Sequence, residues 1–211
     1  MDRTTFIPSR ARRTLGALLT VVVLALGAAA PAARAAALNP PPPDFERCQG
    51  QGQQTVCHGG RVEAGAIEPT GIICGTGSTA FEIVDASGFV RQDATRWYDA
   101  DGNLVRRTSH EVWFDSAWTN PGAGTSVRYR QAVTYDDRLA VPGDFASVTE
   151  TTTGVINFIV PGSGAIVRNA GRTVIDSDGS IEFRSGPQAI LDYFLDGETE
   201  ALQPICDALA G

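Results

Sequence analysis

Thr95-Arg96-Trp97-Tyr98-Asp99-Ala100-Asp101-Gly102-Asn103-Leu104-Val105 is the stretch that decides the fold, because two β-prone runs meet in it at an Asp-Gly turn. The pattern returns 77 residues later as Ile-Asp-Ser-Asp-Gly-Ser-Ile, from Ile175 to Ile181. Glycine in such a turn supplies the positive φ angle that a tight hairpin requires. A calcium loop would need an oxygen ligand where Trp97 and Val174 stand, so both segments predict β-hairpins.

Short runs of β-branched and aromatic residues, separated by Gly, Pro, Asn and Asp, continue on both sides of these turns. Together they favour an all-β fold, an eight-stranded antiparallel up-and-down barrel with short C-terminal helices. Gly186-Pro187 is expected to open one helix and residues 202–209 to form a final helical turn. We expect strands at 79–86, 90–99, 104–119, 126–136, 148–160, 165–176 and 180–184, and at least one more between 55 and 73.

Residues 1–37 have the pattern of a secretory signal peptide. Four arginines precede an apolar run from Leu15 to Ala30, and Ala33-Arg34-Ala35 offers the small residues that a signal peptidase requires. The run is about 16 residues, short of the ~20 that span a bilayer. We therefore expect a secreted, extracellular protein with no membrane span. Arg12-Arg13 leaves general and twin-arginine export both open.

The exported part divides into a Pro-rich N-terminal segment, 38–54, and a single barrel domain, 55–211. Asn39 to Pro43 is expected to form a stiff polyproline spacer outside the fold. Removing residues 1–35 leaves 12 basic and 23 acidic residues, and every basic residue is Arg. This net negative charge repels the phosphate backbone of nucleic acids, and we therefore expect no nucleic-acid partner.

All four cysteines lie in the exported part, and an even number in an oxidising compartment predicts two disulfides. Three pairings are possible. We favour Cys48 with Cys57 and Cys74 with Cys206, the second of which would tie an early strand to the C-terminal tail. A zinc site would need a CxxC pair and further histidines, which the sequence lacks, so we expect no metal site and no cofactor.

The first hairpin also predicts a candidate site. A three-residue turn with a Gly bulge sets Tyr98 opposite Leu104, Arg96 opposite Arg106 and Gln92 opposite His110. Opposed arginines in a half-buried site need water, a carboxylate or an anionic ligand. The alternatives to a cavity that receives an anionic ligand are a register shifted by one residue, or an open barrel end at which both guanidiniums are hydrated. Under the first register, the ligand-lining candidates in the interior are Gln92, Arg96, Tyr98, Arg106, His110 and Phe114, with Arg107 outside.

Four segments of the sequence carry a resemblance to known proteins: Thr95 to Val105, Thr119-Asn120-Pro121, Val160-Pro161-Gly162 and Cys206-Asp207-Ala208-Leu209. Through them the chain resembles small secreted actinobacterial proteins of unassigned function, whose barrels are similar to those of allene oxide cyclases and dirigent proteins and, more distantly, lipocalins. The resemblance implies an eight-stranded barrel with an apolar cavity, and it transfers no reaction because no catalytic motif maps onto this sequence.

Two functions follow from these patterns as expectations. The first is a non-catalytic extracellular barrel that binds a small apolar or amphipathic ligand, acidic ones included, or a partner at the cell surface. The alternative is an isomerase or cyclase in which Arg96, Arg106 and His110 hold a reactive intermediate inside the barrel.

Overall fold

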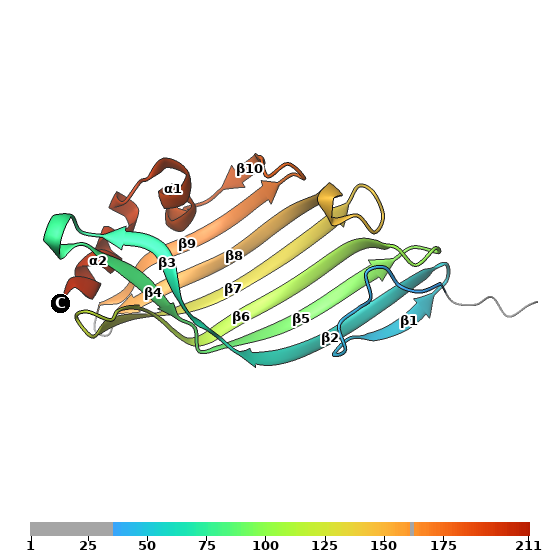
Figure 1. Ribbon diagram of the computed structural model, residues 1–211, viewed down its shortest axis with the longest axis horizontal. Helices are drawn as coiled ribbons and strands as arrows, with labels where there is room; N and C mark the ends of the chain where they lie inside the picture. The colour runs from blue at the N-terminus through green and yellow to red at the C-terminus, as the bar shows by residue number, and fades with distance from the viewer. Residues whose placement is uncertain (1–35, 161–162) are drawn as a thin grey trace, which may run out of the picture. The chain divides into compact units, whose positions relative to one another are not determined.

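The computed structural model describes residues 36–160 and 163–211 (Figure 1). The predicted signal peptide lies outside the described residues, apart from Ala36 and Ala37. Ten strands form one antiparallel sheet: β1 Arg47–Gln51, β2 Gln54–Ala64, β3 Ile67–Cys74, β4 Phe81–Ala86, β5 Phe89–Tyr98, β6 Leu104–Asn120, β7 Thr125–Leu139, β8 Val148–Val160, β9 Gly164–Ile175 and β10 Ile181–Ser185. Two short helices follow, α1 Ala189–Asp196 and α2 Gln203–Ala210.

The sheet is not closed into a barrel. Its strand order is β1-β2-β5-β6-β7-β8-β9-β10, and the β3–β4 hairpin joins through pairing of β4 with β6. Within the described residues β1 and β10 do not pair with each other, and each is only five residues long. The all-β prediction is confirmed, whereas the eight-stranded closed barrel is wrong because closure requires the first and last strands to pair.

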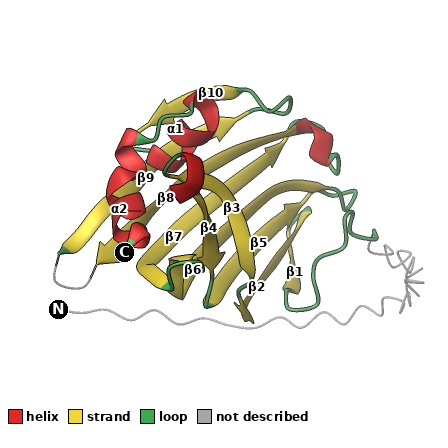
Figure 2. Ribbon diagram, turned by 60° about the vertical axis from the view of Figure 1, so that its left-hand side comes forward, coloured by secondary structure: helices red, strands yellow, loops and turns green. Residues whose placement is uncertain are grey.

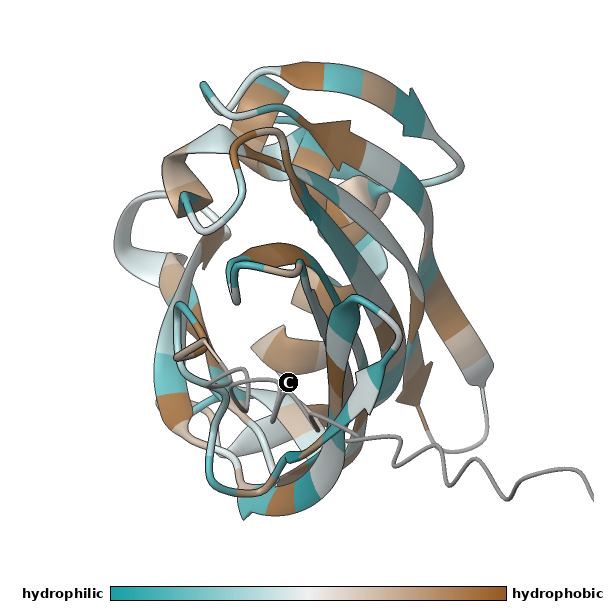
Figure 3. Ribbon diagram, turned by 90° about the vertical axis from the view of Figure 1, so that its right-hand side faces the viewer, coloured by the Kyte–Doolittle hydropathy of each residue, from teal (hydrophilic) through white to brown (hydrophobic). Residues whose placement is uncertain are grey.

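The strongly periodic segments fold as predicted. Each of the seven strands expected after residue 79 is present within a few residues of its expected bounds, and both C-terminal helices form. The stretch from 55 to 73 holds β2 and β3, and β1 precedes them. Hydrophilic and hydrophobic residues alternate along many of the strands (Figure 3), as expected of a sheet with two different faces.

Both Asp-Gly hairpins form and use the same hydrogen bonds. The Asp99 carboxylate accepts from the amides of Asp101 (3.0 Å) and Asn103 (2.8 Å). In the second hairpin the Asp176 carboxylate accepts from Asp178 (3.2 Å) and Ser180 (2.9 Å). Gly102 and Gly179 take positive φ angles of 83° and 86°. The turn prediction is therefore confirmed at both sites.

A β-bulge follows each turn, and it changes the register. Tyr98 pairs with Leu104 as predicted, but Trp97 then pairs with Arg106, so Val105 has no partner of its own. The second hairpin pairs Ile175 with Ile181 and then Val174 with Phe183, which leaves Glu182 as the extra residue. The predicted pairing of Arg96 with Arg106 and of Gln92 with His110 is therefore wrong by one residue, because a bulge inserts one residue into one strand only.

The two disulfides are Cys48–Cys57, between the paired strands β1 and β2, and Cys74–Cys206, between β3 and α2. Both predicted pairings are confirmed.

The sheet is strongly curved (Figure 3), and the helices lie against one of its faces (Figure 2), which we call the inner face. A large apolar cluster lies between this face and α2, with Trp118, Tyr129 and Phe158 from the sheet against Ile205 and Leu209. At the other end of the strands a smaller cluster joins Cys57, Tyr98, Leu104 and Leu139, with Leu38 and Val148 packed against it.

The Pro-rich N-terminal segment is part of the fold. Asn39 accepts from the amide of Leu104 and donates its own amide to Gly102, both at 2.8 Å. The Tyr98 hydroxyl donates to the carbonyl of Pro40 at 2.9 Å. The expectation of a free polyproline spacer over residues 39–43 is therefore wrong, because the strand ends and a buried tyrosine give this backbone hydrogen-bond partners.

Candidate functional site

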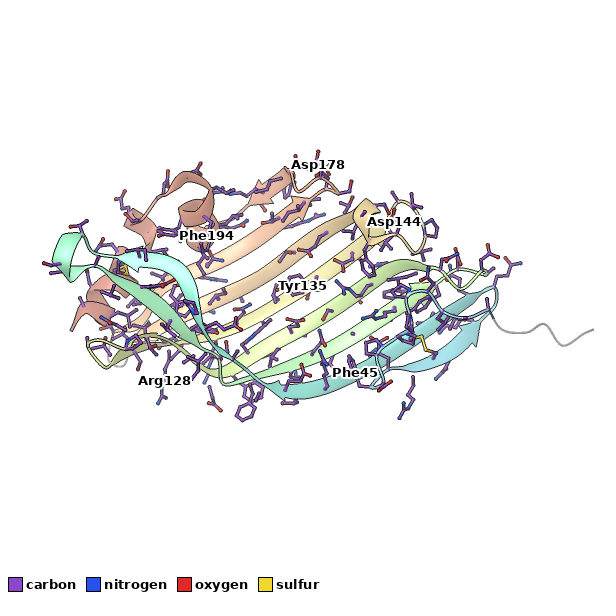
Figure 4. The ribbon with its side chains drawn as sticks, in the orientation of Figure 1. Phe45, Arg128, Tyr135, Asp144, Asp178 and Phe194 are labelled. Atoms are coloured by element: carbon purple, nitrogen blue, oxygen red, sulfur yellow. A yellow bond between two sulfur atoms is a disulfide. The ribbon has the colours of Figure 1, made fainter. Side chains whose placement is uncertain are left out.

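A cavity of about 370 Å³ lies on the inner face, between the two apolar clusters. Along β7, Leu139 belongs to the smaller cluster, Tyr135 to the cavity and Tyr129 to the larger cluster. Tyr135 lies near the middle of the sheet and Phe45 on the side of β1 and β2 (Figure 4). The cavity is lined by Pro43, Phe45, Arg61, Gln92, Ala94, Arg96, Arg107, Ser109, Glu111, Tyr135 and Glu150.

Neighbouring strands β5 and β6 supply much of the polar lining. Gln92 pairs with Glu111, Ala94 with Ser109, and Arg96 with Arg107. The Gln92 amide donates to Glu111 Oε1 at 2.8 Å and to Ser109 Oγ at 3.1 Å. Because alternate residues of a strand share a face, the unbroken alternation between the two bulges of β6 brings Arg107, Ser109 and Glu111 to the same surface.

Each of the two opposed arginines is neutralised by a buried carboxylate. Arg96 Nε donates to Glu46 Oε1 at 3.0 Å, and the two side chains are 13% and 0% exposed. Arg107 Nε donates to Asp137 Oδ2 at 2.6 Å, and the Asp137 side chain is 2% exposed. Of the alternatives that the sequence left open, the structure shows the register shifted by one residue, which opposes Arg96 to Arg107. Carboxylates of the protein itself compensate both charges.

Tyr135 lies between two carboxylates from the neighbouring strands. It pairs with Ser109 of β6 and Thr152 of β8, so Glu111 and Glu150 are its diagonal neighbours on the inner face. Burial raises the pKa of Tyr135 to about 12, and the negative charges of Glu111 and Glu150 act in the same direction.

None of the ion pairs in residues 36–160 and 163–211 includes Glu111 or Glu150. Glu111 accepts hydrogen bonds from Gln92 and Ser109, and Glu150 from the Thr152 hydroxyl at 2.9 Å. The arginines of the cavity, by contrast, are all paired, since Arg61 contacts Glu63 at 2.8 Å. The charge that the cavity offers to a ligand is therefore negative.

Three of the six residues predicted to line the interior lie on the inner face. Gln92 and Arg96 line the cavity. Tyr98 is fully buried in the smaller apolar cluster.

Arg106, His110 and Phe114 lie on the outer face, so the register that placed them inside is wrong. Arg106 Nε donates to Asp136 at 2.8 Å, and its guanidinium lies 4.8 Å from the centre of the Trp97 ring. Nδ1 of His110 is hydrogen-bonded to the Thr134 hydroxyl at 3.0 Å. The Phe114 ring stacks on Phe89. The extra residue Val105 exchanges the two faces of β6, which brings Arg107 inside in place of Arg106.

Eight lining residues besides Arg107 were not predicted from the sequence: Pro43, Phe45, Arg61, Ala94, Ser109, Glu111, Tyr135 and Glu150. The alternation of Arg107, Ser109 and Glu111 would have identified the β6 side once the bulge was known. Strand alternation could not identify Glu46 as the partner of Arg96, because Glu46 lies outside the long strands, in the N-terminal segment.

Comparisons with protein families, with curated protein sequences and with solved structures find nothing that matches this chain. The resemblance to allene oxide cyclase-like and dirigent-like barrels therefore stays a prediction. Among the described residues, no helix is long and apolar enough to cross a membrane.

Proposed function

We propose that the protein is an exported binding protein whose inner-face cavity holds a small amphipathic ligand with a cationic group. The observation that carries this proposal is the position of Tyr135 between Glu111 and Glu150, two carboxylates without an ion-pair partner in the described residues. An acidic ligand is disfavoured, since Glu46 and Asp137 already neutralise Arg96 and Arg107.

The size and chemistry of the cavity support a small molecule. Its volume of about 370 Å³ falls within the range of small-ligand sites. Pro43, Phe45 and Ala94 offer apolar surface to the body of a ligand. Glu111 and Glu150 would accept charge-assisted hydrogen bonds from an ammonium group, and the Tyr135 ring can add a cation–π contact.

Export is part of the proposal and has two supports. The first 37 residues read as a signal peptide. The four cysteines form two disulfides, which persist in oxidising compartments.

Isothermal titration calorimetry with a matched amine and acid tests the ligand class. We expect 2-phenylethylamine to bind and 3-phenylpropionate not to bind. Changing both Glu111→Gln and Glu150→Gln should weaken amine binding by roughly tenfold or more, because two charge-assisted contacts are lost. The control carries Glu182→Gln and Glu198→Gln, which remove the same charge from two exposed sites. Equal losses in both variants, or tighter binding of the acid, would reject the proposal.

The alternative function, an isomerase or cyclase, would require Arg96, Arg106 and His110 to line the same cavity. These residues lie on two opposite faces of the sheet. We therefore advance no second function.

A further inference from the structure

Three arginines gather on the outer face, away from the inner-face cavity. Arg128 and Arg130 lie on β7 and Arg168 on β9, and all three are exposed. Arg130 pairs with Asn157 of β8, which pairs in turn with Arg168. Arg130 and Arg168 are therefore in line across three strands, with Arg128 two residues further along β7. We call these three residues the arginine patch.

The guanidiniums of the arginine patch have no partner among the described residues. None of them forms an ion pair or a side-chain hydrogen bond or lies over an aromatic ring. At the other end of β7, by contrast, Arg138 pairs with Asp136, and Arg106 of the neighbouring β6 pairs with the same carboxylate. Like charges within about a Debye length, ~8 Å at physiological salt, repel one another, so the uncompensated cluster favours an anion.

A second cavity, of about 380 Å³, adjoins the patch. Arg128 and Arg130 line it together with residues of the neighbouring strands, Ala117 of β6 and Ile159 of β8, and Arg128 is labelled in Figure 4. Asp115, at the β6 bulge with a φ angle of 55°, lines it as well and pairs with neither arginine in the described residues. The patch therefore keeps its positive charge beside a partly open cavity.

We propose that the arginine patch binds a multivalent oxyanion, a chain of linked phosphate groups. Residues two apart on a strand are separated by about 6.7 Å, and residues two strands apart by about 9.5 Å. These are spacings of the backbone positions, from which the three side chains project on the same face of the sheet. Linked anionic groups can pair with each guanidinium separately, which a single group does less well. Phosphate suits this arrangement because it accepts bidentate hydrogen bonds from arginine and carries a high charge per group.

Titration of the whole protein with tripolyphosphate tests this proposal. We expect binding that weakens as salt is raised from 20 to about 300 mM, because exposed charges are screened. Changing both Arg130→Ala and Arg168→Ala should lower the affinity by roughly tenfold. The control is Arg91→Ala with Arg172→Ala, which removes two arginines from the outer face outside the patch. It should change the affinity less than about twofold.

Three outcomes would overturn the proposal. One is equal loss of affinity in the patch variant and the control variant, since the effect would then reflect total charge. Another is the absence of tripolyphosphate binding at 20 mM salt. The third is binding of the wild type to phosphatidylglycerol vesicles without binding to tripolyphosphate, which would make the patch a contact for a membrane surface. The far-UV circular dichroism of both variants, whose changes are all exposed, should match the wild type.

Discussion

The ion pair between Glu46 and Arg96 ties the N-terminal segment to the inner face. The Glu46 side chain is fully buried and Arg96 is 13% exposed. Gly59 makes room for this contact, since a Cβ there would lie 2.3 Å from the carbonyl oxygen of Phe45. Glu46, which lies outside the long strands, thus neutralises the charge of Arg96 in the cavity wall.

Replacing Glu46 should therefore destabilise the protein more than replacing an exposed carboxylate. Glu46→Ala leaves the Arg96 charge buried and unpaired, which costs about 3 kcal/mol. Glu63→Ala breaks the exposed pair with Arg61 and should cost less than about 1 kcal/mol. Urea denaturation of both variants measures the free energies of unfolding. Equal losses would contradict the assignment of Glu46 as a buried counter-charge.

Two tyrosines should make the folded state sensitive to alkaline pH. Burial is the main cause that raises the pKa of both Tyr129 and Tyr135 to about 12. Between pH 10 and 12 the unfolded chain loses these protons while the folded protein retains them. Stability should therefore be intact below pH 10 and should fall across this window, by ~1 kcal/mol per pH unit for each tyrosine. Denaturation at several pH values should show a shallower fall in Tyr135→Phe; the same slope as the wild type would exclude this role.

At the scale of the elements, each hairpin has one feature that the sequence predicts, the turn, and one that it does not, the bulge that follows. Asp-Gly turn chemistry is local, so both turns could be predicted from the residues. The bulges at Val105 and Glu182 could not, because the choice between regular pairing and a bulge depends on the twist and packing of the whole strand. A shift of one residue is enough to exchange faces, which is why Arg107 and not Arg106 lines the cavity.

The two turn glycines provide a matched test of how the N-terminal segment packs. Both have positive φ angles, so alanine at either position is strained by roughly 1–2 kcal/mol. A Cβ at Gly102 would also lie 2.7 Å from the carbonyl oxygen of Ala37, whereas one at Gly179 meets nothing within 4 Å. We expect Gly102→Ala to lower the melting temperature clearly more than Gly179→Ala. Equal shifts would mean that the segment does not pack against the first turn.

At the scale of the whole molecule, the sequence patterns could not predict whether the sheet closes into a barrel. Strand alternation and turn spacing predicted the strands after residue 79, but they do not tell which distant edges meet. In the structure β4 of the β3–β4 hairpin pairs with β6, and α1 and α2 pack against the inner face at the larger apolar cluster. The cavity therefore lies on an open curved sheet, and its lining depends on pairings and on an N-terminal segment that no local pattern reveals.

The Cys74–Cys206 disulfide should stabilise this arrangement more than Cys48–Cys57. The bonded residues are separated by 132 positions in the first case and by 9 in the second. Loop-closure entropy then gives stabilisations of roughly 5 and roughly 3 kcal/mol. Serine at both positions of each pair, followed by urea denaturation, measures the difference. A larger loss from the Cys48 and Cys57 pair would show that local constraint near β1 outweighs the long loop.

Native mass spectrometry of the protein recovered from culture medium tests the central claim most directly, since it weighs the protein together with what it has bound. We expect the wild type to carry a small organic cation, and the variant with Glu111→Gln and Glu150→Gln to carry none. The variant with Glu182→Gln and Glu198→Gln should retain the cation. A bound anion in the wild type, or the same cation retained when Glu111 and Glu150 are neutralised, would contradict the account.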